Sequence, residues 1–231
     1  RQMCIRDSNL GSINLSRFVK DGFTPEASID WDQLAESSET LVRFLDNVVT
    51  WNEDLNALPK QRQAASETRR LGLGVMGIAD MLNQLGVAYD SEQGTMMIEK
   101  VMEYITNASY QASSFIAKEK GSSSIFDEEA YMECPFVKEA LSEQTHNMIR
   151  KNGLRNIAIM SIAPTGSISN IVLGYKSEEK NYIGVSGGVE PIFSTFYTRR
   201  SESFGNKMFK VFHSTIQAYI DKMGIQEDID K

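Results

Sequence analysis

The chain has 231 residues, a hydrophobic fraction of 41%, a charged fraction of 24% and a formal net charge of −7, which are ordinary values for a globular protein with a core. The negative charge argues against a surface for nucleic acid or for an anionic membrane, although backbone N–H groups could still hold the phosphates of one nucleotide. No apolar run approaches the roughly 18 residues that span a bilayer, no signal-peptide pattern is present and there are only two cysteines, so we expect a cytoplasmic protein.

The first eight residues have neither a helical nor a strand period, and they resemble the translated read-through of a sequencing adapter. We therefore expect residues 1–8 to be a non-native leader. The remaining sequence shows no repeat, no low-complexity tract and no domain boundary. It predicts a single domain over residues 9–231, truncated at both ends.

Residues 9–15 alternate apolar and polar side chains, which predicts a short strand. Asp30 is expected to start a long helix, because Gln33 follows in the capping-box position. The core-facing stripe of this helix is predicted to be Leu34, Leu41, Leu45 and Val48. The sequence Leu58-Pro59 ends this helical unit.

Residues 60–85 show a helical pattern that three glycines interrupt between positions 72 and 77, and we expect these glycines to let a helix pack closely against a neighbour. Another long helix is predicted over residues 91–120, with Gly121 as its C-terminal stop. Its apolar stripe comprises Met97, Val101, Ile105, Ala108, Ala112 and Phe115. A shorter helix is expected over residues 136–150.

The character of the sequence changes at residues 156–163, a nearly continuous apolar run that predicts a strand covered on both faces. A glycine-rich segment at 184–191 separates it from a final helix, expected over about 206–223. Helices with a few buried strands between them predict the α/β class. The pattern is that of a helix-rich, partial piece of an α/β barrel.

The loop that follows residues 156–163 carries the strongest chemical signal. It consists of Pro164, Thr165, Gly166, Ser167, Ile168 and Ser169. Such a loop before a helix exposes consecutive backbone N–H groups, which attract phosphate without Lys or Arg, and its hydroxyls can donate further hydrogen bonds. It is not a Walker A loop, because no Gly-Lys-Ser/Thr follows. The same residues are equally typical of a simple N-capping turn, so local chemistry leaves both interpretations open.

Residues 72–77 also match the glycine pattern of a dinucleotide-binding loop. That pattern requires a strand immediately before it, whereas residues 64–70 are polar and helical in character. This context argues against a nicotinamide-dependent dehydrogenase. His146 and His213 have no Cys, Asp or Glu at ligand spacing, so no metal site is predicted.

Three further positions have two interpretations each. Cys134 is more typical of a small buried or loop residue than of a nucleophile. Glu190 is expected to be a loop residue before Pro191, with a site carboxylate as the alternative. The pair Arg199-Arg200 is expected to be solvated, with phosphate binding as the alternative.

Five segments, taken in order, resemble the large-subunit barrel of ribonucleotide reductases. They are residues 9–15 (NLGSINL), 69–80 (RRLGLGVMGIAD), 88–91 (AYDS), 163–169 (APTGSIS) and 186–191 (SGGVEP). The resemblance extends from residue 9 to about residue 223. It implies that the chain is the middle-to-late part of a ten-stranded α/β barrel, and that residues 164–169 hold the phosphates of the substrate.

The resemblance also implies an activity. Members of this family reduce the 2′-hydroxyl of ribonucleoside di- or triphosphates with a thiyl radical, and thioredoxin- or glutaredoxin-like proteins recharge a cysteine pair. Residues 164–169 together with 188–191 look most like the adenosylcobalamin-dependent class. The alternative is a radical supplied by a separate metal-containing subunit. A second copy of the chain or such a small subunit is then an expected partner.

The chain departs from the family pattern at its cysteines. The radical cysteine of the family lies in an Asn-x-Cys-x-Glu loop that this sequence lacks. No catalytic residue is therefore assigned, and this piece alone is expected to be inactive. Ser8 stands where many members have a redox cysteine, which leaves Cys4 as a weak candidate. A non-catalytic nucleotide-binding or assembly module remains the alternative function.

Overall fold

The computed structural model describes residues 9–53, 55–201 and 205–226. The chain divides into two compact units, the first made of residues 9–13, 31–74 and 96–163 and the second of residues 14–30, 75–95 and 164 onward. Three elements pass from one unit into the other: β1 (Asn9–Asn14), β4 (Leu71–Met76) and α4 (Glu92–Lys120). Each unit has its own buried side chains.

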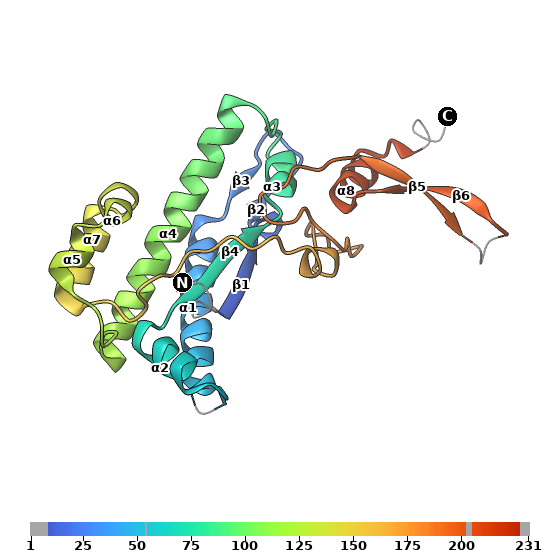
Figure 1. Ribbon diagram of the computed structural model, residues 1–231. Helices are drawn as coiled ribbons and strands as arrows, with labels where there is room; N and C mark the ends of the chain where they lie inside the picture. The colour runs from blue at the N-terminus through green and yellow to red at the C-terminus, as the bar shows by residue number, and fades with distance from the viewer. Residues whose placement is uncertain (1–8, 54, 202–204, 227–231) are drawn as a thin grey trace. The chain divides into compact units, whose positions relative to one another are not determined.

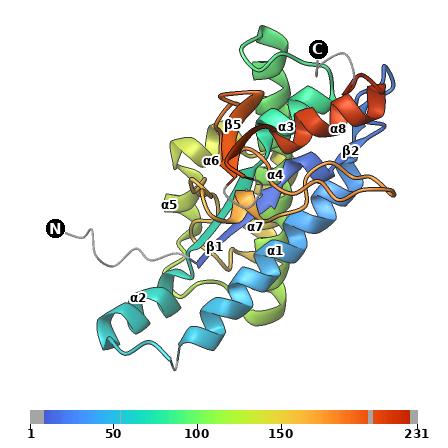
Figure 2. The same cartoon turned by 90° about the vertical axis from the view of Figure 1, so that its right-hand side faces the viewer.

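The first unit is mainly helical. Besides most of α4 it contains α1 (Trp31–Asn52), α2 (Pro59–Thr68), α5 (Glu128–Met132), α6 (Pro135–Ala140) and α7 (Glu143–Asn152). Figures 1 and 2 both show α1 alongside α4, and Arg43 on α1 makes a two-pronged ion pair with Glu119 on α4 at 2.8 and 2.9 Å. The apolar faces of the helices supply much of the core, with Leu34, Val42, Val101, Ile105 and Ile149 each fully buried.

Several predicted helix boundaries are confirmed. The helix predicted to start at Asp30 is α1, which ends at Asn52 and so before the predicted end at Leu58-Pro59. The helix predicted over 91–120 is α4, and Gly121 has the positive φ of 84° that a helix-ending glycine adopts. The stripes are displaced in places, since Phe115 is exposed while Ile116 is buried. The helix predicted over 136–150 is divided into α6 and α7, because the chain is extended at Leu141, the C-cap of α6, and Ser142 then caps α7 through the Thr145 amide.

The prediction of one helical stretch over residues 60–85 is wrong. Between α2 and α3 (Ile78–Gln84) the chain forms strand β4, all six residues of which are buried and which pairs with β1. Gly74 allows the backbone of β4 to lie close to the backbone of residue 161, because a Cβ on Gly74 would be only 2.5 Å from the Ser161 carbonyl oxygen. Residues 64–68 are helical, as the argument against a dinucleotide fold requires.

The strand predicted over residues 156–163 is only partly present. The segment lies along β4, where the Leu71 amide donates to Ala158 O at 2.8 Å and a parallel bridge joins Leu73 to Met160. It is not covered on both faces, since Ser161 and Ile162 are exposed. A run of β-branched residues did not distinguish a complete buried strand from this short, one-sided pairing.

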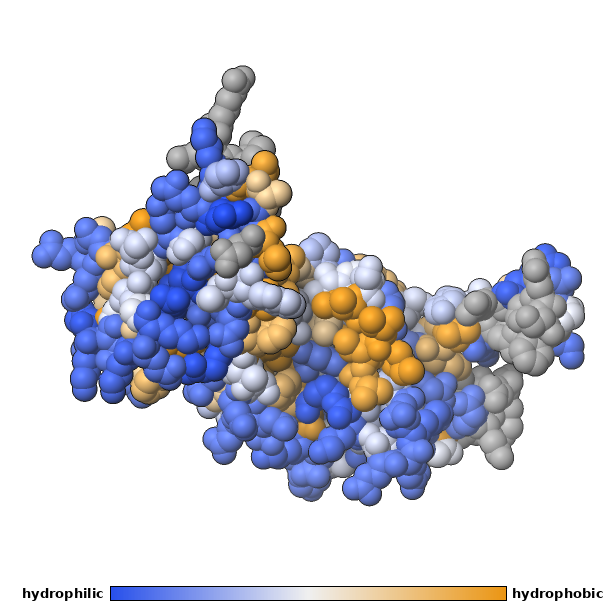
Figure 3. Space-filling model, turned by 90° about the horizontal axis from the view of Figure 1, so that it is seen from below, coloured by the Kyte–Doolittle hydropathy of each residue, from blue (hydrophilic) through white to orange (hydrophobic). Residues whose placement is uncertain are grey.

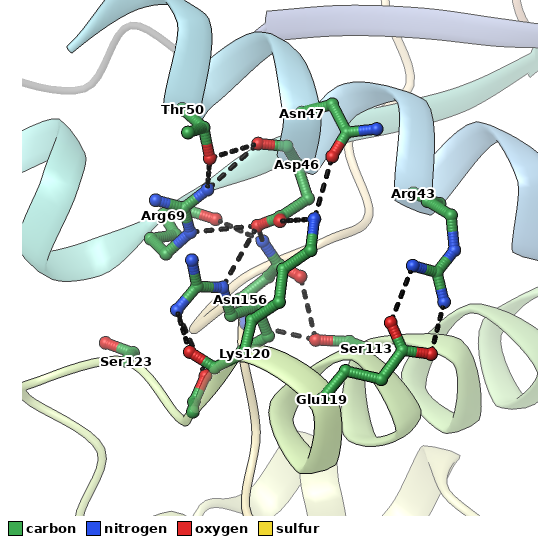
Figure 4. Close-up of polar contacts among 12 residues, drawn as sticks. Arg43, Asp46, Asn47, Thr50, Arg69, Ser113, Glu119, Lys120, Ser123 and Asn156 are labelled. Atoms are coloured by element: carbon green, nitrogen blue, oxygen red, sulfur yellow. Dashed lines mark hydrogen bonds and ion pairs between the residues drawn. The ribbon is translucent and has the colours of Figure 1, made fainter.

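A buried polar network holds the first unit together (Figure 4). Asp46, on α1, is fully buried, and Arg69 donates to its carboxylate at 2.8 Å and to its carbonyl oxygen at 2.9 Å. The side chain of Asn156 bridges the Asp46 carboxylate and the Arg69 carbonyl, and its own oxygen accepts from Ser113. Arg69 also donates a hydrogen bond to the carboxylate of Glu53 at 2.8 Å. A buried charge with this many partners is typical of a fold-defining contact.

The second unit consists of short elements. They are η1 (Leu15–Arg17), β2 (Val19–Lys20), β3 (Ser28–Ile29), α3, η2 (Ile168–Asn170), β5 (Phe196–Ser201), β6 (Lys207–Phe212) and α8 (Ser214–Met223). The antiparallel β5–β6 pair, with Phe196 opposite Phe212, replaces the first part of the helix predicted over 206–223. The helix begins only at Ser214, after His213 as its N-cap.

The mixed α/β class is confirmed, but a closed barrel is not seen. Within the described ranges the strands form three two-stranded sheets, β1–β4, β2–β3 and β5–β6. Large apolar side chains stay exposed, including Ile171, Ile183 and Phe193, and Figure 3 shows such apolar surface in orange. No helix in the described part of the chain is long and apolar enough to cross a membrane.

Candidate functional site

Two loops of the second unit line a cavity of about 300 Å³, which is at the lower end of the range for ligand pockets. Gly166 and Ser169 line it from the loop at 164–170, and Ser186 and Glu190 line it from the loop at 184–191. His213, immediately before α8, completes this part of the wall. The sequence-predicted loop and the second glycine-rich segment thus meet at one place.

Consecutive backbone N–H groups of the first loop lack protein partners. Within the described residues, the amides of Gly166, Ser167 and Ile168 donate no hydrogen bond, whereas the amide of Ser169 donates to Thr165 O at 2.9 Å. All three residues with free amides are exposed. Unpaired amides at an open surface are available to an anion.

Gly166 is not explained by the packing of the described residues. Its φ is not in the left-handed region, and a Cβ built on it would meet no atom within 4 Å. By contrast, a Cβ on Gly187 would lie 2.8 Å from the Pro164 carbonyl oxygen. Gly187 is therefore required by the approach of the two loops, whereas the open space at Gly166 leaves room for a ligand close to the backbone.

Thr165 joins the two loops. It is buried, adopts a left-handed conformation with φ of 55°, and its hydroxyl accepts a hydrogen bond from the Gly188 amide at 2.9 Å. The Ser169 carbonyl accepts from the Val185 amide at 2.8 Å. These two bonds fix the spacing between the segments that line the cavity.

The helix expected after the loop is much shorter than predicted. Residues Ile168–Asn170 form a 3₁₀ turn of three residues, so a helix dipole contributes little and the individual amides and hydroxyls must do the binding. Ser167 is exposed, and Ser169 is 4% exposed but lines the cavity. Pro164, without an N–H, contributes its carbonyl to the contact with Gly187.

A buried carboxylate that sequence reasoning missed supports the other wall. Asp80, on α3, accepts hydrogen bonds from the amide and the hydroxyl of Ser186, both at 2.7 Å, and from the hydroxyl of Thr215. Its second oxygen lies 3.7 Å from Nδ1 of His213. Asp80 is the last residue of the segment 69–80 that resembles the reductase family. Nothing in the local sequence indicates that its partners lie 106 and 135 positions away.

His213 presents its imidazole between this carboxylate and the cavity. The Thr215 amide donates to Nδ1 at 3.4 Å, a pairing that assigns the ring proton to Nε2. Glu190 is an exposed loop residue before Pro191, as expected, and it also lines the cavity, so its alternative role as a site carboxylate stays a prediction. None of the described residues that line the cavity is a Lys or an Arg.

The other candidate residues lie elsewhere. Cys134 is an exposed free thiol that precedes α6, and Arg200 is exposed on β5. His146 contacts Val137 O at 2.8 Å. Cys4 and the expected leader lie outside the described residues. No group of three or more His, Cys, Asp or Glu that could hold a metal ion occurs in residues 9–53, 55–201 and 205–226.

The chain is similar to known proteins over nearly all of its length. The family model described as "Ribonucleotide reductase, barrel domain" matches residues 4–231. A vitamin B12-dependent ribonucleoside-diphosphate reductase from Mycobacterium tuberculosis is 35% identical over 191 residues, which is 83% of this chain and 22% of the relative. The corresponding protein of Thermoplasma acidophilum is 37% identical over 193 residues, 83% of this chain and 21% of the relative.

Relatives of a second kind are also similar. The ribonucleoside-diphosphate reductase subunit alpha of Chlamydia pneumoniae is 31% identical over 220 residues, covering 84% of this chain and 19% of the relative. The chain therefore spans about a fifth of the length of the curated relatives it matches.

Proposed function

Because the chain belongs to the ribonucleotide reductase barrel-domain family, we propose that it is part of a catalytic subunit that reduces ribonucleotides to 2′-deoxyribonucleotides. Relatives carrying the name ribonucleoside-diphosphate reductase cover 83–84% of the chain. A nucleoside diphosphate is accordingly the proposed substrate. The radical step at the 2′-hydroxyl requires a cysteine, and Cys134 is not among the described residues that line the cavity.

The contribution of this chain is to bind the substrate's phosphates with residues 164–169. The observation that carries this assignment is the run of three free amides at Gly166, Ser167 and Ile168. The first of these residues, Gly166, has open space where a side chain would be. Amide N–H groups and hydroxyls match the acceptor oxygens of a phosphate without a permanent positive charge. The hydroxyls of Ser167 and Ser169 are the side-chain donors proposed to complete the site.

The proposed source of the radical is adenosylcobalamin. Its support is the higher identity with the two vitamin B12-dependent relatives, 35% and 37%, than with the alpha subunits, 30–31%. A separate metal-containing subunit is the alternative that the alpha-subunit relatives support. The cavity of about 300 Å³ is smaller than a cobalamin, so its residues are assigned to the nucleotide.

The same assignment implies partners. A dithiol reductant of the thioredoxin or glutaredoxin type would return electrons to the enzyme after each turnover, because reduction of a hydroxyl consumes two electrons. A second copy of the subunit or a small radical-generating subunit is the other proposed partner. These proposals concern the complete protein.

The phosphate assignment is tested by titrating a nucleoside diphosphate into the complete subunit carrying Gly166→Val or Ser167→Ala. The valine side chain would occupy the space proposed for phosphate, so we expect at least a tenfold loss of affinity. Loss of one hydroxyl donor is expected to cost a few-fold, corresponding to about 1 kcal/mol. Ser124→Ala, at another exposed serine, is the control.

Thermal unfolding of the same variants separates binding from folding. A Cβ at position 166 meets no neighbouring atom, so Gly166→Val is expected to unfold at nearly the wild-type temperature. Unchanged nucleotide affinity in both Gly166→Val and Ser167→Ala would remove the phosphate assignment.

A further inference from the structure

Asp80 is a buried carboxylate whose place in the fold calls for an explanation. It is fully buried on α3, yet the described part of the chain brings no lysine or arginine into an ion pair with it. Its oxygens are satisfied instead by uncharged donors, namely the Ser186 amide, the Ser186 hydroxyl and the Thr215 hydroxyl. Burying a carboxylate costs free energy unless hydrogen bonds compensate for the lost hydration. The side chain therefore holds its three donors in fixed positions.

Each partner of Asp80 belongs to the wall of the cavity or adjoins it. Ser186 lines the cavity, and its carbonyl accepts a further hydrogen bond from the Gly77 amide at 2.8 Å. Thr215 lies in the first turn of α8, two residues after His213, which also lines the cavity. One carboxylate therefore holds two separate segments of the wall.

The segment after Ser186 depends on this anchor. Gly187 and Gly188 follow it, and Gly188 has φ of 45°. Two consecutive glycines give the backbone many alternative conformations. Fixing Ser186 on one side and bonding Gly188 to Thr165 on the other selects the conformation that places Glu190 at the cavity.

We propose that Asp80 is a positioning residue for the phosphate-binding cavity, which fixes the turn at 186–190 and the start of α8 and so sets the affinity for the nucleotide without contacting it. This inference rests on the proposed phosphate-binding function of residues 164–169. If the cavity wall is already ordered before the nucleotide binds, the free energy of binding is not reduced by the entropic cost of ordering the wall. An asparagine cannot take over this role, because its NH₂ group would face either the amide and hydroxyl donors of Ser186 or the hydroxyl donor of Thr215.

The test compares Asp80→Asn with Asp46→Asn in the complete subunit. Asp46 is equally buried but does not line the cavity or contact its walls. Both variants are expected to lower the unfolding temperature. Only Asp80→Asn is expected to raise the Kd for the nucleoside diphosphate and the KM, each by about tenfold, with kcat within about twofold of wild type.

Ser186→Ala is the milder variant if Asp80→Asn does not fold. It removes one hydroxyl from Asp80 and leaves the backbone bond, so a rise in Kd of about threefold is expected. A purely structural role would lower stability and leave Kd and KM unchanged in Asp80→Asn or, failing that, in Ser186→Ala. That result would overturn the inference.

Including Gly166→Val in the same titrations separates the two proposals. If Gly166→Val weakens nucleotide binding while Asp80→Asn and Ser186→Ala do not, the positioning role is wrong and the phosphate site stands. If none of the three changes the affinity, the phosphate site itself is wrong. Weakened binding in all three supports both.

Discussion

Two buried aspartates, one in each unit, are satisfied in different ways. Asp46 is paired with the buried Arg69 at 2.8 Å, and further polar partners surround this pair (Figure 4). Asp80 has hydroxyl and amide donors instead, and the nearest basic group is His213 at 3.7 Å. Both side chains are fully buried.

This difference in partners indicates different roles: Asp46 stabilises the fold of the first unit, whereas Asp80 positions the wall of the cavity. The partners of Asp46 come from α1, α4, the C-cap of α2 and the segment at 156, and they bond to one another within the first unit. The partners of Asp80 lead outward to Ser186 and His213, which line a cavity. A buried charge balanced by a charge defines a fold, whereas one balanced by neutral donors at a cavity can orient a binding surface.

The largest effect is expected from Arg69→Met. Removing the guanidinium takes away the cation closest to the buried Asp46 carboxylate, while Arg155 at 3.6 Å and Lys120 at 3.9 Å remain. We therefore expect a cost of about 3 kcal/mol, at the lower end of the range for a broken buried ion pair. Hydrogen exchange in α1 and at residues 154–160 should accelerate accordingly, by about two orders of magnitude. The nucleotide affinity of the folded protein should stay at the wild-type value.

Arg69→Met also tests whether Asp46 and Asp80 differ in role. If this variant weakened nucleotide binding as much as Asp80→Asn, the two carboxylates would not differ in role. Exchange rates near wild type would instead show that the Asp46 network contributes little to local stability.

A smaller effect is expected from Thr215→Val, which keeps the shape of the side chain but removes the hydroxyl that donates to Asp80. The unsatisfied carboxylate oxygen should cost about 1–3 kcal/mol. Unlike Arg69→Met, this variant should also raise the Kd for the nucleoside diphosphate. Calorimetric titration and thermal unfolding of one preparation measure both quantities, and a stability loss without a change in Kd would place Thr215 with the purely structural partners.

The smallest effect extends the comparison to the accessible carboxylate of Asp221. Burial opposes its ionisation, but hydrogen bonds from Lys180, Tyr182 and Gln217 outweigh that effect and hold the pKa of Asp221 below its usual value of 3.8. The stabilisation is therefore complete above about pH 3.8 and is lost as the pH falls through the lower folded-state pKa. Burial, with the bond to Asp221 in addition, raises the pKa of Tyr182 to about 12.

Replacing Lys180 by Met should remove less than about 1 kcal/mol at neutral pH, because this ion pair is partly solvated. The difference between wild type and Lys180→Met should shrink as the pH is lowered from 5 to 2. Acid-unfolding curves followed by circular dichroism measure it. A difference that stayed constant over this range would exclude ionised Asp221 as its source.

Periodicity predicted the long helices well and the strands poorly. Helices α1 and α4 were evident because their apolar spacing extends over many turns. Strand β4 was not, since its alternating glycines look like helix-packing positions until Ser161 is known to lie against Gly74. The β5–β6 hairpin was missed for a related reason, because short strands gain their stability from partners along the chain.

The candidate site shows the same division. The chemical character of residues 164–169 followed from their amides, hydroxyls and glycine. Of these residues Gly166 and Ser169 line the cavity, and phosphate binding by the loop stays a prediction. The length of the helix after the loop was overestimated. The roles of Thr165 and Asp80 in holding two loops together were not foreseen, because their partners are distant in the sequence.

Residue type and local spacing were enough to predict the family, the α/β class, the long amphipathic helices and the segment with phosphate-binding character. That residues 71–76 form a strand, and that Asp80 bonds to Ser186 and Thr215, became evident only in the folded chain. These features depend on hydrogen bonds between positions distant in the sequence, more than a hundred residues apart in the case of Asp80, and such bonds form only after the chain has folded.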